Sequence, residues 1–345
     1  GTQTEVAQAY GRQEVERASE IGGLAAALSI AIGVLLTGAG LLLVPYVSTI
    51  MGAEGAVHDF SSQYIRIRLF GSPAVLVSLA AFGILRGLQD MRTPFRVAVS
   101  INILNIILDP LLIYGYGPFP RLGIFGAGLA STISQWIGAF WAVGVVLRRL
   151  GIPARIRLGD VVKLFQVGRD LFIRTGLLTA FFIFSTRAAT RIGPDAGAAH
   201  QAIRQVWVFT ALFLDAYAIT GQSLIGFFMG PGRLEQARRV ARLVYAWSAA
   251  TGVILSAAMW LGQNLVVRLL LPPSAGGIFF SAWLVAVVFQ PINALAFASD
   301  GIHWGTGDFR FLRNVMIAAT TFGGIAIYLL DETVSGALMW IWLIT

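Results

Sequence analysis

Three long segments of the chain, residues 21–53, 122–147 and 243–267, contain no charged side chain at all. Each is longer than the roughly 20 apolar residues that an α-helix needs to cross the hydrocarbon core of a bilayer. A helix on the surface of a soluble protein would need a polar face, which these segments lack. Over the whole chain, 57% of residues are hydrophobic and only 12% are charged, which is far from the balance of a water-soluble fold. The segments are therefore predicted to be transmembrane helices.

The same pattern continues along the chain and predicts an all-α polytopic membrane protein. We predict ten spans, at approximately residues 21–50, 66–86, 95–117, 122–148, 170–191, 202–229, 242–270, 277–304, 311–330 and 335–345. The last is too short to cross a bilayer at a rise of about 1.5 Å per residue. The chain also begins with Gly1 rather than methionine, so we expect it to be truncated at both ends.

The basic residues indicate which loops face the cytoplasm. The net charge is +8, but the Arg and Lys side chains stand in short loops between apolar spans, so topology explains them better than a nucleic-acid partner. Cytoplasmic loops retain an excess of Lys and Arg. We therefore place one set of loops in the cytoplasm and the protein in the plasma (inner) membrane. These loops lie near residues 1–20, 86–96, 149–169, 230–242 and 305–313.

An internal duplication relates the two ends of the chain. Gln3 and Gln222 stand at nearly the same spacing as three later pairs, which are Pro73 with Pro291, Gly87 with Gly305 and Asp90 with Asp308. Repetition at a fixed period is the signature of a repeat architecture. The spacing covers six helices, an even number, so the repeats are predicted to run parallel, as in some secondary transporters.

The longest polar connection divides the two repeats and contains Gly151 and Pro153. It predicts an N-terminal lobe at residues 1–150, a cytoplasmic linker at 151–169 and a C-terminal lobe at 170–345. If each lobe has six helices, the first residues of the chain are the end of a second helix. About one and a half helices are then expected to be absent before Gly1, together with part of the last helix.

Ionisable side chains inside membrane spans are uncommon and are functional candidates by default. Asn102, Asn105 and Asp109 repeat at helical spacing and predict a polar stripe on one face of the third span. Pro110 follows, and it should kink the helix and free the carbonyl of Ile106. Carboxylate, amide and carbonyl oxygens would then suit a small cation such as Na+, or Asp109 would carry a proton. The alternative is a structural Asn/Asp network that ties helices together.

The second half carries buried charges of both signs. Asp215 and Arg187 are expected toward the outer face, and Arg174 and Asp300 toward the cytoplasm. Depth suggests that they pair, and for Arg174 and Asp300 a structural clamp is the favoured role. No acid occupies the repeat equivalent of Asp109, so ion coupling is predicted to lie in the first half.

Two further kinds of residue stand out. Pro73 and Pro291 are repeat-related, and each would free a carbonyl four residues earlier and act as a bending point or a packing kink. His200, near the outer end of its helix, is interpreted as a solvated or interfacial histidine rather than a ligand.

The chain contains no Walker loop, no nucleophile elbow and no paired Cys or His metal site, and it has no cysteine. We therefore predict that it is not an enzyme and needs no cofactor. Transport energy would come from an ion gradient of H+ or Na+.

Several segments resemble the multidrug and toxic compound extrusion (MATE) transporters. They are RGLQDMRTPF at 86–95, NIILDPLLIYG at 105–115 and GIFGAGLASTISQW at 123–136. Three more are similar to the branch named for the DNA-damage-inducible F protein, namely TRAATRIGPDAGAAHQAIRQVW at 186–207, LDAYAITGQSLIG at 214–226 and FASDGIHWGTGDFRF at 297–311.

The resemblance implies twelve helices in two six-helix lobes around a central cavity. It also implies export of organic cations, drugs or toxic metabolites in exchange for H+ or Na+, by a protein that we expect to be a monomer. It places Asn105 and Asp109 in the ion site of the first lobe, with Thr132 and Gln135 on the next helix as neighbours. Asp215 and Asp300 match acidic positions of this branch.

Two other classes of function are compatible with parts of this pattern. A lipid-linked oligosaccharide flippase of the same wider superfamily would share the duplication, but it should line its cavity with more basic residues. A membrane receptor or channel would not need two related lobes with buried acids.

Overall fold

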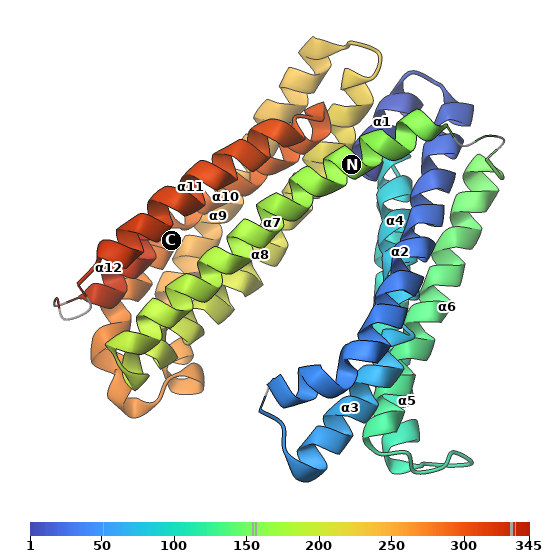
Figure 1. Ribbon diagram of the computed structural model, residues 1–345. Helices are drawn as coiled ribbons and strands as arrows, with labels where there is room; N and C mark the ends of the chain where they lie inside the picture. The colour runs from blue at the N-terminus through green and yellow to red at the C-terminus, as the bar shows by residue number, and fades with distance from the viewer. Residues whose placement is uncertain (51, 154, 156, 332–333, 335) are drawn as a thin grey trace. The chain divides into compact units, whose positions relative to one another are not determined.

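The computed structural model describes residues 1–50, 52–153, 155, 157–331, 334 and 336–345 (Figure 1). The described residues form helices and no β-strand. The first six helices are α1 (Thr2–Gly11), α2 (Val15–Ile50), α3 (Gly55–Leu69), α4 (Ser72–Gly87), α5 (Arg92–Tyr114) and α6 (Ile124–Leu150). They are followed by α7 (Leu158–Ile192), α8 (Pro194–Met229), α9 (Leu234–Leu270), the 3₁₀ turn η1 (Pro273–Ala275), α10 (Gly276–Thr306), α11 (Phe309–Leu329) and α12 (Ala337–Ile344).

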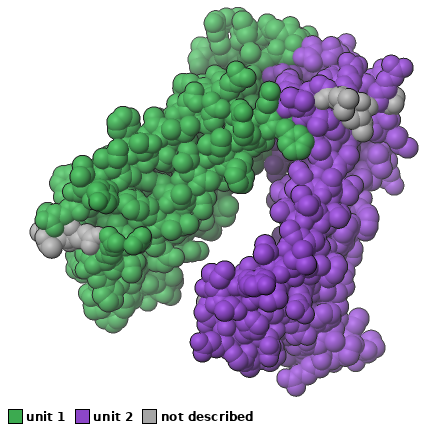
Figure 2. Space-filling view, in the orientation of Figure 1, with its two compact units in different colours: residues 1, 165–345 green, residues 2–164 purple. Residues whose placement is uncertain are grey.

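The helices form two compact units, coloured separately in Figure 2. Unit 2 contains residues 2–164, and unit 1 contains Gly1 and residues 165–345. In unit 2, α4 packs against α1, α2 and α6, and α5 packs against α6. In unit 1, α8, α9 and α10 pack against one another, and α12 packs against α10. The predicted linker at 151–169 is only partly a loop, because α7 begins at Leu158 and the boundary between units falls inside that helix.

Seven of the described helices are long and apolar enough to cross a membrane, or eight if α3 and α4 together count as one bent span. The predicted span at 66–86 therefore differs from the structure, which has two helices that meet at an angle of 43°. The predicted span at 170–191 lies in α7, and the predicted short segment at 335–345 contains α12 (Ala337–Ile344), but neither helix is among the seven. Residues 1–20 were expected to be the tail of one helix, but α1 ends at Gly11 and residues 15–20 already belong to α2.

The duplication is visible in the packing of single residues. A Cβ atom added to Gly87 would meet Val6 and the carbonyl of Gln3, and one added to Gly305 would meet Ile225 and the carbonyl of Gln222. The glycines are repeat equivalents, and so are the residues that they contact. Glycine is needed at both positions because the helices approach too closely for a side chain.

Helix starts repeat as well. The Asp90 carboxylate accepts the backbone N–H of Thr93 at 3.0 Å, and Asp308 accepts that of Phe311 at 3.2 Å. Both bonds cap the first turn of the following helix, α5 or α11, where backbone donors have no partner within the helix. The predicted duplication therefore holds for local capping as well as for sequence.

Pro73 stands at the start of α4, just after the bend in unit 2. Proline has no N–H, so the carbonyl of Leu69 has no donor four residues later. The Thr37 hydroxyl on α2 donates to that carbonyl at 2.8 Å. Gly33, one turn earlier on α2, lies so close that an added Cβ would be 2.5 Å from the Cα of Pro73. The bend is therefore supported by a glycine and a hydroxyl on one face of α2.

Unit 1 repeats this arrangement around Pro291, which lies inside α10. The Ser256 hydroxyl on α9 donates at 2.7 Å to the carbonyl of Val287, the one that Pro291 leaves without a donor. Gly252, one turn before Ser256, would place an added Cβ 2.9 Å from the Cα of Pro291. Here α10 continues through the proline, whereas the equivalent span of unit 2 is divided into α3 and α4.

Replacing Thr37 by Val should lower the free energy of unfolding by about 1 kcal/mol, because Val keeps the shape of the side chain but removes the donor to Leu69. The midpoint of thermal unfolding in detergent measures the change. Thr49→Val is the matched control, since among the described residues the exposed Thr49 hydroxyl bonds only to the carbonyl of Pro45 on its own helix. Equal shifts for the two variants would contradict the assigned role of Thr37.

Candidate functional site

Asn105 and Asp109 lie one turn apart on α5 and are both half-buried. The Asn105 amide Nδ2 donates to Asp109 Oδ1 at 3.3 Å and to the Ser131 hydroxyl of α6 at 3.3 Å. Among the described residues, the Asp109 side chain makes no other hydrogen bond. Its second carboxylate oxygen and the oxygens of Asn105 and Ser131 are therefore available to a proton or a small cation.

Asn102 does not join this group, although it was predicted on the same stripe. It is exposed, and its amide donates to the carbonyl of Ala98 on its own helix at 2.8 Å. An amide bonded one turn back on its own helix is locally satisfied and does not need a second helix.

The α6 neighbours that the family resemblance implied point elsewhere. The buried Thr132 hydroxyl donates to the carbonyl of Ile67 at 3.1 Å, and Gln135 Oε1 accepts from Arg68 Nη1 at 3.0 Å. Trp136, the next residue, donates to the carbonyl of Phe70 at 3.0 Å. In the described part of the chain, neither Thr132 nor Gln135 is hydrogen-bonded to Asp109.

These bonds show that Thr132 and Trp136 of α6 hold the end of α3, rather than contribute to the Asn105–Asp109 group. The carbonyls of Ile67, Leu69 and Phe70 all lie at the end of α3, where the helix stops and leaves acceptors without partners. Side chains of α6 and α2 satisfy all three. The broken span is therefore held by its neighbours, and Ser131 is the α6 residue that faces Asn105.

In unit 1, Arg174 of α7 and Asp300 of α10 form an ion pair. The Arg174 guanidinium also lies over the Trp304 ring, with its Cζ atom 5.4 Å from the centroid. Arg174 is buried, and a buried cation needs a partner because its desolvation is unfavourable. The contact itself agrees with the expected pairing, and whether it acts as a clamp or in transport remains a prediction.

A second buried pair was not predicted. Asp170 of α7 is 4% exposed and accepts from Arg313 Nη1 of α11 at 2.7 Å.

Asp215 is half-buried on α8, and Arg187 is exposed on α7. Their expected pairing and their roles stay predictions.

His200 differs from its interfacial interpretation. It is 2% exposed, its Nε2 lies 3.2 Å from the Thr186 hydroxyl, and its ring lies 5.4 Å from that of Trp342. Packing by α12 buries a position that would otherwise lie near the end of α8.

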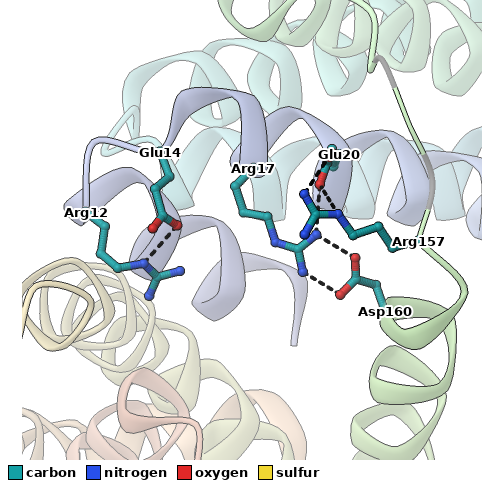
Figure 3. Close-up of polar contacts among 6 residues, drawn as sticks. All are labelled: Arg12, Glu14, Arg17, Glu20, Arg157 and Asp160. Carbon is teal, nitrogen blue, oxygen red and sulfur yellow. Dashed lines mark hydrogen bonds and ion pairs between the residues drawn. The ribbon is translucent and has the colours of Figure 1, made fainter.

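Four charged side chains connect the start of α7 to α2 within unit 2 (Figure 3). Arg17 donates to Asp160 at 2.6 Å and to Glu20 at 2.9 Å, and Arg157 lies 3.1 Å from Glu20. Glu20 is only 4% exposed and has two cationic partners. Residues 157–160 are therefore fixed to the N-terminal end of α2.

This cluster predicts a pH dependence of stability. The hydrogen bond from Arg17 lowers the pKa of Asp160 below its ordinary value. A carboxyl whose pKa is lower in the folded state stabilises that state above the unfolded pKa of about 3.9, and this contribution is lost as the pH falls through the folded pKa. Asp160→Asn should therefore reduce stability by about 1 kcal/mol near pH 6, and its difference from the parent should shrink below about pH 4.

Thermal unfolding at several pH values measures that difference. Glu14→Gln is the control, because the Arg12–Glu14 pair in the same view is exposed and local. An Asp160→Asn difference that stays constant from pH 6 to pH 3 would exclude a stabilising role for the ionised carboxylate.

Apolar helices of membrane-spanning length, a two-fold internal repeat and polar groups inside the spans together define a multi-pass membrane protein of secondary-transporter architecture. The chain belongs to the MatE family, whose family model matches residues 1–111 and 171–329. Members of this family are transporters rather than enzymes. The match therefore favours a MATE transporter over the two alternatives, a lipid-linked oligosaccharide flippase and a membrane receptor or channel.

Named relatives occur in plants and bacteria. The chain is 34% identical over 301 residues to Protein DETOXIFICATION 44, chloroplastic, of Arabidopsis thaliana, a match that covers 80% of this chain and 56% of that protein. It is 27% identical to DNA damage-inducible protein F of Escherichia coli, a match that covers 94% of this chain and 71% of that protein. It is 29% identical to the probable multidrug resistance protein NorM of Deinococcus radiodurans, a match that covers 96% of this chain and 75% of that protein. The chain thus spans little more than half the length of its plant relative.

Solved structures share the fold. A crystal structure of MATE in the bent conformation has a TM-score of 0.90 at 20% identity and covers 99% of this chain and 77% of that chain. An outward-facing multidrug resistance MATE family transporter has a TM-score of 0.89 at 20% identity and covers 99% and 78%. The predicted family and the all-α membrane fold are confirmed.

Proposed function

We propose that the protein exports small organic compounds in exchange for H+ or Na+, and that Asn105 and Asp109 hold the coupling ion. The observation that carries this proposal is the half-buried group on α5 and α6, in which Asp109 has a single hydrogen-bond partner among the described residues. Hard cations take oxygen ligands, and the carboxylate, amide and hydroxyl oxygens of this group are of that kind.

The charge of Asp109 inside a membrane span explains how the Asn105–Asp109 group could couple movement of the ion to movement of the exported compound. An ionised carboxylate there is unfavourable, and a bound proton or Na+ neutralises it. Ion binding and release would therefore change the relative free energies of the states of the transporter, which is the requirement for coupling. Unit 1 has no acid at the position equivalent to Asp109, which is Ile327, so we place coupling in unit 2.

For the exported compound, we propose organic cations and amphipathic drugs. Relatives described as multidrug resistance proteins support this class, although the names belong to those proteins. We also propose a monomer in the plasma membrane, with the loops at 86–96, 230–242 and 305–313 in the cytoplasm. The chain has no cysteine, so maleimide labelling of single cysteines placed in those loops tests their side, and light scattering of the purified protein tests its mass.

The test of the transport proposal uses proteoliposomes and a fluorescent organic cation such as ethidium. Proton and sodium gradients are imposed separately, and movement of the dye against its own gradient is followed. We expect one of the two gradients to drive the dye. Failure of both would remove the ion-coupled exporter.

A further inference from the structure

Unit 1 contains a cavity of about 300 Å³, and neither Asn105 nor Asp109 is among its lining residues. It is lined by residues of α7, α8, α10 and α12. Aromatic rings of Phe182, Trp207, Phe289 and Trp342 form much of its wall. Its volume and aromatic lining are those of a small-molecule site, which is typically apolar with a few placed polar groups.

The charge of the cavity is positive. Arg204 of α8 lines it, and no Asp or Glu is present among the lining residues. Among the described residues, the guanidinium of the half-buried Arg204 donates only to the Thr186 hydroxyl, at 3.4 Å, and it lies over the Phe182 ring with its Cζ atom 5.6 Å from the centroid. In the described structure no carboxylate pairs with it. An Arg side chain in a largely apolar wall is stabilised by an anion, and its planar fork suits a carboxylate.

Buried donors without partners lie in the same wall. Gln290 of α10 is fully buried, and its Nε2 has no hydrogen-bond partner among the described residues. Its Oε1 accepts from Asn293 at 3.4 Å, which leaves the amide nitrogen as the unused end. Trp342 Nε1 is a second buried donor without a partner among the described residues. Buried polar groups are nearly always paired, so these nitrogens indicate a missing acceptor.

We propose that this cavity binds aromatic carboxylates. The carboxylate accepts hydrogen bonds from Arg204 and from Gln290, and the ring of the ligand packs against Trp207 and Trp342. This site goes beyond the proposed function, since it would take an anion in unit 1, whereas the coupling group of unit 2 takes a cation. It can be tested by equilibrium binding, with no ion gradient.

The experiment titrates purified protein in detergent with naphthalene-2-carboxylate and, in parallel, with protonated 2-naphthylmethylamine, a cation with the same ring system. We expect saturable binding of the carboxylate at an affinity at least about tenfold above that of the amine. Arg204→Gln should weaken carboxylate binding about tenfold or more, because a charge-assisted hydrogen bond is lost. Gln290→Leu, which removes the unpaired donor at similar volume, should weaken it several-fold.

Two controls separate this proposal from other causes. Arg268→Gln removes an exposed arginine at the end of α9 that does not line the cavity, and it should leave the affinity unchanged. Asp109→Asn should also bind the carboxylate normally, so failure of ion coupling would not affect this result. Thermal unfolding confirms that each variant is folded. If the Arg204→Gln protein does not fold, the relative affinities of the parent protein for the carboxylate and the amine test the proposal. Absence of carboxylate binding, equal or tighter binding of the amine, or full affinity in folded Arg204→Gln protein would overturn the proposal.

Discussion

Replacing Asp109 by Asn should reduce ion-driven export to the level of vesicles without protein, while the variant inserts and folds as the parent does. Asn has nearly the same shape and can still bond to Asn105, so the packing of α5 against α6 is retained. It cannot carry a proton or supply a negative charge to a cation. The loss should therefore concern the coupling step and not the structure.

The measurement is accumulation of a fluorescent organic cation in proteoliposomes under an imposed proton or sodium gradient. Asp59→Asn is the control, because the Asp59 side chain is 85% exposed on α3 and its removal should leave transport unchanged. Asn105→Leu, which removes the partner of Asp109, should impair coupling less than Asp109→Asn does. Normal ion-driven export by the Asp109→Asn variant would remove this residue from the coupling site.

The largest structural effect is expected at Gly301, where replacement by Ala should lower the free energy of unfolding by about 1–3 kcal/mol or more. An added Cβ at Gly301 would lie 2.3 Å from the backbone oxygen and 2.5 Å from the Cα of Ala218 on α8. Backbone atoms cannot rotate away as a side chain can, so α8 and α10 must separate. The displacement would also disturb Asp300 and its pair with Arg174.

The internal repeat supplies a matched control at Gly83, the equivalent position on α4. There an added Cβ would come no closer than 3.7 Å to any atom of α1, so Gly83→Ala should be tolerated and gain up to about 1 kcal/mol from helix propensity. Thermal unfolding of the two variants in detergent measures the contrast. Similar losses at both glycines would show that close approach at Ala218 does not determine the outcome.

The spans and the duplication could be predicted because they depend on composition and spacing. A membrane helix must be apolar for about 20 residues, and repeated Pro, Gly and Asp residues keep their register whatever the surrounding fold. Asp90 and Asp308 illustrate this, since each caps the helix that follows it. Local rules of this kind are expressed within a few residues of the chain.

The details of the site depend on how the helices are rotated about their axes, which the pattern does not specify. Ser131 and Thr132 are neighbours in sequence, but successive residues of a helix point about 100° apart. Ser131 therefore reaches Asn105 on α5, while Thr132 bonds to Ile67 at the end of α3. Only the packing of α6 determines which hydroxyl faces Asn105.

Contacts between segments far apart in the chain could not be predicted from the sequence pattern either. Arg313 lies near the start of α11 and Asp170 lies well inside α7, and neither position indicates a particular partner. His200 was interpreted from its place on α8 alone, and Trp342 of α12 contributes to its burial. The break at Phe70 and Gly71 likewise depends on donors from α2 and α6, although Pro73 marked the region as a bending point.

The central claim is that movement of the compound and movement of the ion are coupled, and the reverse reaction tests it most directly. A concentration gradient of the dye is imposed across proteoliposomes in the absence of any ion gradient, and fluxes of H+ and Na+ are recorded. The account predicts that dye moving down its gradient drives one of these ions in the opposite direction, and that Asp109→Asn abolishes this ion flux. Dye transport by the parent protein with neither ion moving would contradict it.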